Sequence, residues 1–184
     1  MNIKKMSLLI LGIVSFNSCT TTKSSDPTEF DFTNPSPELV KEIDSYTLET
    51  MEEWLEMTIL GFQKGRELTD KEQIYAKVIG IPDPENIRIL ETNTFEPLTK
   101  KLRDLQLKLG QPNNFQTLGG AQLYKTILVN INNKDKEETI QHELVHVAQD
   151  IRMGLIEKIR FHQLELKYLG YGGSTLENEA YNHP

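Results

Sequence analysis

The stretch from His142 to His146, which reads His-Glu-Leu-Val-His, constrains this chain more than any other. On an α-helix, residues four apart lie on one face, so both imidazoles can reach a single ion. Neutral imidazole nitrogens suit Zn²⁺ at bond lengths of about 2.0–2.1 Å. Glu143 would lie beside such an ion, where its carboxylate can take a proton from a water molecule. The pattern H-E-x-x-H therefore predicts a zinc site, with His142 and His146 as ligands and Glu143 as the general base.

The residues around this motif favour a buried helix. Four apolar side chains recur at the spacing of one helix face: Leu144, Val147, Ala148 and Ile151. Asp135 and Glu138 have the spacing of a capping box at the helix start, and Gly154 is placed to end the helix. Two other interpretations are a chance motif in a Glu-rich helix and a structural zinc site. The structural site is disfavoured because the chain has one cysteine, whereas closed structural sites are usually rich in cysteine.

The first residues of the chain indicate export. Two lysines precede an apolar run over 6–16 that is too short to span a bilayer, and small residues then lead to Cys19. This arrangement resembles a bacterial lipoprotein signal peptide, which implies cleavage before Cys19 and lipidation of that residue. An ordinary secretory signal is the alternative. We expect a signal peptide over 1–18, a flexible tether over 19–36, and a domain that is lipid-anchored in the cell envelope, facing the periplasm or the exterior.

The charge distribution argues against one class of partner. The 184-residue chain has 20 Lys and Arg against 27 Asp and Glu, a net charge of −7. Its basic residues are scattered among acidic ones, as on solvated helix faces, and form no basic stripe. We therefore expect no nucleic-acid partner.

Residues 37–184 are predicted to form one α+β domain, mostly helical, with a small sheet that precedes the motif helix. Helical spacing and breaker residues predict further helices from 37 to 61 or 65, from 69 to 80, over 97–109 and over 155–169. Alternating β-branched residues predict a short strand over 87–90 and a longer strand over 123–131. The longer strand suits either a sheet edge, where a peptide could add as a strand, or a buried centre. Trp54 is interpreted as a core residue rather than part of a ligand groove.

A catalytic zinc takes three protein ligands, and the chain offers two candidates for the third near its end, Glu177 and Glu179. Residues two apart on a helix point in different directions, so only one of the two can face the ion. Ser174 and Glu177 also have the S-x-x-E spacing of a capping box. The alternative role of Glu177 is therefore a helix cap.

The motif and the later run Glu177-Asn178-Glu179-Ala180 together resemble the gluzincin group of the zincin metallopeptidases. In many gluzincins a downstream helix supplies a glutamate ligand that begins an E-x-x-A pattern. The resemblance covers residues 142–181 and implies a zincin-like fold, with Glu177 as the third zinc ligand and peptide-bond hydrolysis as the activity. The longer metzincin pattern HExxHxxGxxH is absent.

Zincins often stabilise the oxyanion with a Tyr or His side chain, which must place a donor about 3 Å from the developing charge. Tyr171 is the first candidate for this role, followed by Tyr168 and His162. The expected function is a membrane-tethered zinc metallopeptidase that acts on a peptide or protein substrate. The alternative is a zinc-binding lipoprotein without peptidase activity, acting as a binding or assembly module. A third hypothesis is an inert domain that binds no zinc.

Overall fold

The computed structural model describes residues 34–93, 95, 104 and 119–183. Several expectations from the sequence fall on other residues. The signal peptide, the lipidation site Cys19, most of the tether and, apart from Asp104, the helix over 97–109 lie outside the described residues.

The described residues form an α+β fold, as the sequence predicts. The helices are α1 (Pro37–Lys64), α2 (Asp70–Val78), α4 (Lys136–Met153), α5 (Leu155–Leu169) and α6 (Thr175–Asn182). The strands are β1 (Arg66–Glu67), β2 (Arg88–Thr92), β3 (Gly120–Leu123) and β4 (Thr126–Asn130). Two short 3₁₀ turns, Pro84–Asn86 and Tyr171–Gly173, complete the described elements. None of these helices combines the length and the apolar character that a membrane crossing needs.

Local signals set most of the helix ends. The Ser36 side chain accepts a hydrogen bond from the backbone N–H of Leu39 (3.2 Å) and so caps α1. At α2 both bonds of the predicted capping box form, because Thr69 and Glu72 each accept from the other's backbone N–H. The capping box predicted for α4 is wrong. Asp135 occupies the N-cap position but makes no side-chain cap bond, and its own N–H instead donates to Asn133 Oδ1 (3.0 Å).

The four strands form one sheet in the order β1-β2-β4-β3. β2 and β4 are parallel, with Ile89 opposite Ile127, and the two other pairings are antiparallel. The single strand predicted over 123–131 is wrong, because the chain reverses at Tyr124 to form the β3–β4 hairpin. Tyr124 takes a left-handed φ of 53°. Tyrosine rarely adopts this conformation, so the residue type does not predict a turn here. β4 is therefore an inner strand, as the buried alternative proposed, and β3 is an edge strand among the described strands.

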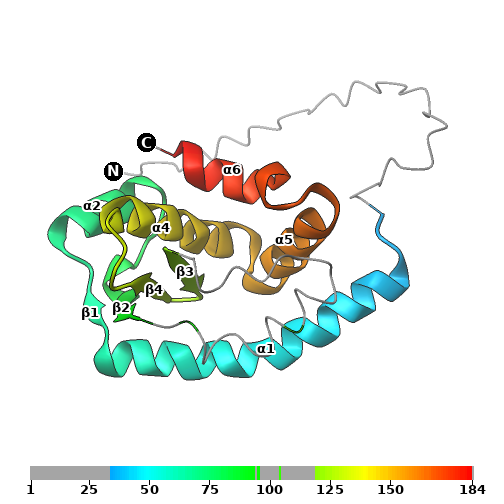
Figure 1. Cartoon of the computed structure of the whole chain (residues 1–184), viewed down its shortest axis with the longest axis horizontal. Coiled ribbons are helices and arrows are strands. Elements are labelled where there is room, and N and C mark those ends of the chain that lie inside the picture. The colour runs from blue at the N-terminus through cyan, green and yellow to red at the C-terminus, as the bar shows by residue number, and fades with distance from the viewer. Residues whose placement is uncertain (1–33, 94, 96–103, 105–118, 184) are drawn as a thin grey trace, which may run out of the picture.

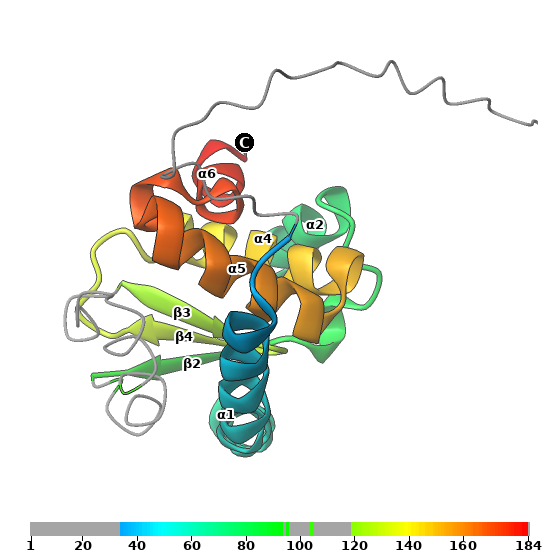
Figure 2. The same cartoon turned by 90° about the vertical axis from the view of Figure 1, so that its right-hand side faces the viewer.

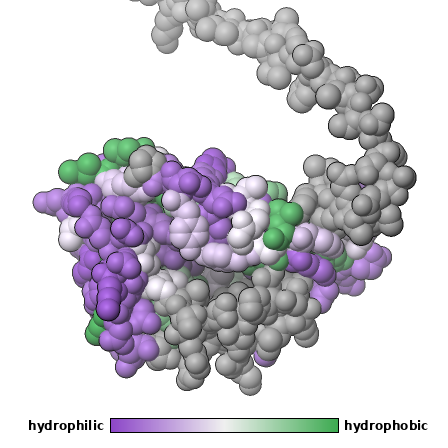
Figure 3. Space-filling view, turned by 45° about the horizontal axis from the view of Figure 1, so that its top comes forward, coloured by the Kyte–Doolittle hydropathy of each residue, from purple (hydrophilic) through white to green (hydrophobic). Residues whose placement is uncertain are grey.

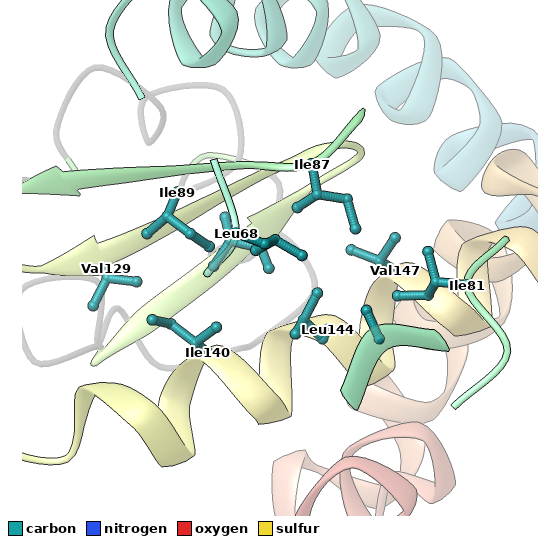
Figure 4. Close-up of a cluster of buried hydrophobic side chains, with 10 residues drawn as sticks. Leu68, Ile81, Ile87, Ile89, Val129, Ile140, Leu144 and Val147 are labelled. Carbon is teal, nitrogen blue, oxygen red and sulfur yellow. The ribbon is translucent and has the colours of Figure 1, made fainter. Parts of the chain in front are cut away.

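β4 is buried on both faces, which explains its uninterrupted apolar run. Ile127 and Val129 belong to a core cluster under α4, to which the helix contributes Ile140, Leu144 and Val147 (Figure 4). Leu128 points to the opposite face and packs with Trp54 and Met57 of α1, which confirms Trp54 as a core residue. The predicted apolar face of the motif helix is correct except at Ile151, which is 51% exposed.

Helices cover both faces of this sheet. α1 runs along one face and α4 crosses the other (Figure 1), and the view along α1 shows the same layers (Figure 2). α6 packs on the side of α4 that faces away from the sheet, while α5 contacts both α4 and α1. In the view of Figure 3 the described residues present a mainly hydrophilic surface, on which the apolar areas are small and separate. The motif helix α4 thus lies between the sheet and α6.

Candidate metal centre

Two helices that are distant in the sequence bring three potential ligands together. His142 and His146 are one turn apart on α4, and their Nε2 atoms are 3.2 Å apart. α6 places the Glu177 carboxylate against them, with Oε2 at 3.3 Å from His142 Nε2 and Oε1 at 3.5 Å from His146 Nε2. All three side chains are largely buried. The structure therefore gathers the residues that the sequence predicts as ligands.

The spacing of these atoms suits a small tetrahedral ion. Ligands at about 2.0–2.1 Å from a tetrahedral zinc are separated from one another by about 3.3–3.4 Å. The three separations of 3.2, 3.3 and 3.5 Å are close to that value. Glu177 Oε2 is also buried without a hydrogen-bond partner among the described residues, a costly state that a cation would relieve. His142, His146 and Glu177 could therefore hold a metal ion.

Gln149 determines which nitrogen of His146 is available to a metal. This glutamine is fully buried (0% exposed), and its Nε2 donates to the Leu176 carbonyl (3.0 Å) and to Glu179 (3.1 Å). Its Oε1 lies 2.8 Å from His146 Nδ1 and can only accept. In its neutral form His146 must then carry its proton on Nδ1, which leaves the Nε2 lone pair available to a metal. Sequence reasoning missed Gln149, although its position three residues after His146 puts it on the same side of the helix.

A second buried residue, Glu165 of α5, holds the start of α6. Its carboxylate accepts hydrogen bonds from the Ser174 hydroxyl (2.8 Å), the Thr175 N–H (2.9 Å) and the Thr175 hydroxyl. These bonds satisfy donors that a helix start otherwise leaves unpaired. Nothing in the local sequence indicates this role, because the contact joins two helices.

Glu177 takes part in the helix cap through its backbone N–H, while its side chain is free for the other role considered, that of a ligand. Ser174 Oγ accepts from the Glu177 N–H (3.3 Å), so the serine caps α6 as the S-x-x-E pattern predicts. The Glu177 side chain does not complete the capping box and turns toward the histidines instead. Burial disfavours its charge, but contacts with three histidines outweigh burial and hold the pKa of Glu177 well below its usual range.

Glu179, the other candidate ligand, is engaged elsewhere. Its two carboxylate oxygens each lie 2.7 Å from the guanidinium of Arg152, and it also accepts from Gln149. This bidentate pair draws Glu179 toward the C-terminal end of α4 and away from the histidines. Only Glu177 of the two glutamates faces the histidines, in agreement with the helix argument.

Glu143 lies beside the three potential ligands. Its side chain is 7% exposed and reaches a cavity of about 330 Å³ that His142 also lines. Burial raises the pKa of Glu143, against the effect of the neighbouring histidines. Gly120 of β3 lines the same cavity, and a Cβ atom there would lie 2.5 Å from Thr139 Cγ2 and 3.3 Å from Glu143 Cγ. A glycine at 120 is thus required for β3 to approach α4 this closely.

The three residues considered as oxyanion donors occupy different places. Tyr171 lines the cavity, with its hydroxyl 3.4 Å from that of Tyr181, whose ring lies 4.4 Å from the His142 ring. Burial and the nearby Glu177 raise the pKa of Tyr171 far above its usual value, so its hydroxyl stays protonated and able to donate. His162 sits behind Glu177, with Nε2 3.1 Å from Oε1 in a contact that does not meet hydrogen-bond geometry. Tyr168 does not line the cavity.

Comparisons of the chain with protein-family models, with curated proteins and with solved structures find no match. The class to which this site belongs is therefore defined by its residues alone: two histidines one helical turn apart, a glutamate from a second helix, and a further glutamate at an adjoining cavity.

Proposed function

We propose that this protein is a zinc-dependent, gluzincin-like hydrolase that cuts peptide bonds, with His142, His146 and Glu177 as the metal ligands. The observation that carries the proposal is the buried His-His-Glu group with tetrahedral ligand spacing, placed next to a carboxylate that opens to a cavity. Two histidines and one glutamate are a known ligand set of catalytic zinc. When bound, Zn²⁺ supplies Lewis-acid activation of a water molecule and of a carbonyl group.

Glu143 acts as the general base and then as the general acid. It takes a proton from the attacking water at its carboxylate and delivers that proton to the leaving amine. A purely structural metal site would not need Glu143, which is nearly buried and lines the cavity. Tyr171 is the proposed donor to the carbonyl oxygen as negative charge develops there, because it lines the same cavity and its hydroxyl stays protonated.

The peptide backbone is proposed to lie along β3. This strand is at the edge of the sheet among the described strands, and its first residue, Gly120, borders the cavity. An extended peptide can pair with such an edge by strand addition. At about 330 Å³ the cavity is at the lower end of the roughly 300–1,000 Å³ of small-ligand pockets, so it suits a short stretch of extended chain rather than a folded domain.

The proposed setting is the bacterial cell envelope. The apolar run before Cys19 and the polar residues after it support an exported, lipid-anchored protein with the domain on a tether. A peptide or protein exposed at the membrane surface is then the proposed substrate.

The test compares the zinc-loaded protein with its Glu143→Gln variant on a mixture of peptides, with the products identified by mass spectrometry. The variant should keep one zinc per chain and the parent melting temperature, but lose at least about 10²-fold in cleavage rate. Cleavage at the parent rate would refute the role of Glu143. A parent that binds one zinc and cleaves nothing would favour the alternative, a zinc-binding module without peptidase activity.

A further inference from the structure

The cavity beside the metal centre has an acidic end. Asp135 and Glu138, at the start of α4, line it together with His142 and Glu143. No Lys or Arg of the described residues lines it. The cavity therefore presents carboxylates to whatever enters, and no described Lys or Arg in its wall offsets their charge.

Asp135 and Glu138 differ from the charged residues next to them, which form ion pairs. Glu137 pairs with Lys71 of α2, and Lys136 pairs with Glu91 of β2 (2.8 Å). Asp135 and Glu138 form no ion pair with any described residue. The acids that face the cavity are thus the ones left without a cation.

Glu143 gives a second indication, beside the two acids, that a ligand occupies this space. It is 93% buried, as its 7% exposure implies, and it lines the cavity without an ion pair to any described residue. Burying a carboxylate in this way is costly unless something that enters the cavity pairs with it. Tyr75 of α2 lines the same wall, and an aromatic ring beside a cavity can attract a cation.

The positions of Asp135 and Glu138 on α4 set their distance from the proposed metal ligand His142, and so from the bond that would be cut. Glu138 and Asp135 precede His142 by four and seven residues, which at 1.5 Å per residue is about 6 Å and about 10 Å along the helix axis. An extended peptide advances about 3.3 Å per residue. A substrate side chain opposite Glu138 or Asp135 would therefore lie about two or three residues from the bond that is cut.

Acidic residues also stabilise a helix start through the helix dipole, and this role must be separated from recognition. Asp135 makes no cap bond to α4, so hydrogen bonding to the helix does not account for it. A dipole effect would change the stability of the protein and would leave the choice of peptide unaffected.

We propose that this site selects peptides with a Lys or Arg two or three residues from the cleaved bond, and that Asp135 and Glu138 recognise the cationic side chain. The inference rests on the proposed function, because it assumes that a peptide occupies the cavity. It names a substrate class that the metal ligands alone do not specify.

Binding to a zinc-loaded protein that carries Glu143→Gln tests the proposal without cleavage. Two alanine-based hexapeptides that differ only by Lys or norleucine at one central position are titrated calorimetrically. The Lys peptide should bind about fivefold more tightly, the upper range for an exposed ion pair, and the advantage should shrink as salt is added. Adding Asp135→Asn and Glu138→Gln should reduce the ratio to about one.

Glu137→Gln is the matched control, because it removes an acid from the same turn that pairs with Lys71. It should leave the peptide ratio unchanged. Melting curves establish that every variant is folded. Equal affinities in the Glu143→Gln parent, no binding of either peptide, or a ratio that survives loss of both acids would each overturn the inference. A protein that cleaves peptides with no preference for Lys would refute this inference and leave the proposed function standing. A zinc-loaded protein that cleaves no peptide would instead refute the proposed function.

Discussion

Replacing Gln149 by methionine should weaken metal binding even though Gln149 is not a ligand. Methionine fills a similar volume but offers no acceptor to His146 Nδ1 and no donor to the Leu176 carbonyl. Each buried polar group left without a partner costs about 1–3 kcal/mol, so the loss of two partners should lower the free energy of unfolding by about 2–6 kcal/mol. Loss of the partner that orients a metal-binding histidine typically lowers metal affinity by about 10–100-fold.

Gln149→Glu separates orientation of His146 from general destabilisation. The carboxylate still accepts from His146 Nδ1–H but cannot donate to Leu176, and it faces Glu179. The Glu variant should therefore be destabilised as the Met variant is, yet recover most of the metal affinity. Zinc affinity is measured by competition with a chelator, the tautomer of His146 by ¹⁵N NMR shifts, and stability by urea unfolding.

The result that refutes this reasoning is specific. If folded samples of both variants lose zinc affinity equally, the acceptor at His146 Nδ1 does not matter. The tautomer assignment would then be wrong, and Gln149 would act only by joining α4 to α6.

Two further predictions concern Glu177 and Glu72. Glu177→Ala should lower zinc affinity by more than about 10–100-fold while the protein stays folded, because it removes a proposed ligand rather than a residue that orients one. Metal content after dialysis measures this effect. Unchanged metal content would exclude Glu177 as a ligand. At Glu72, burial raises the pKa but the pairing with Arg66 outweighs it, so the folded-state pKa lies below the ordinary 4.5. The pair then stabilises the fold above about pH 4.5, and its contribution is lost as the pH falls through the lowered pKa. Urea unfolding of metal-free protein should show Glu72→Gln less stable than the parent at neutral pH and equal to it well below pH 4.5, and a difference that persists in acid would contradict the assignment.

Elements set by short-range rules could be predicted from the sequence. The caps at Ser36 and Thr69, the glycine that ends α4 and the pairing of His142 with His146 on one helix face all depend on residues within a few positions of one another. Their outcome needs no knowledge of the rest of the chain.

Features set by contacts between distant elements could not be predicted. The reversal at Tyr124 lacks the usual glycine or asparagine, and the alternation of apolar residues continues through it. Ile151 matches the apolar period of α4, but no described core cluster extends beneath that end of the helix, so it stays exposed. The roles of Gln149 and Glu165 appear only once α6 is placed against α4 and α5.

The anchoring of α6 has a consequence for how the site would respond to a metal. Glu165 fixes the start of α6, and Gln149 fixes the contact of α6 with α4. Of the three proposed ligands, only His146 takes part in these hydrogen bonds. The conformational entropy of placing Glu177 is therefore lost when the chain folds, before any ion arrives. In a zinc finger, by contrast, the ion itself drives folding. A metal that binds here as proposed would meet a preorganised site, so its binding free energy would go into affinity rather than into building the domain.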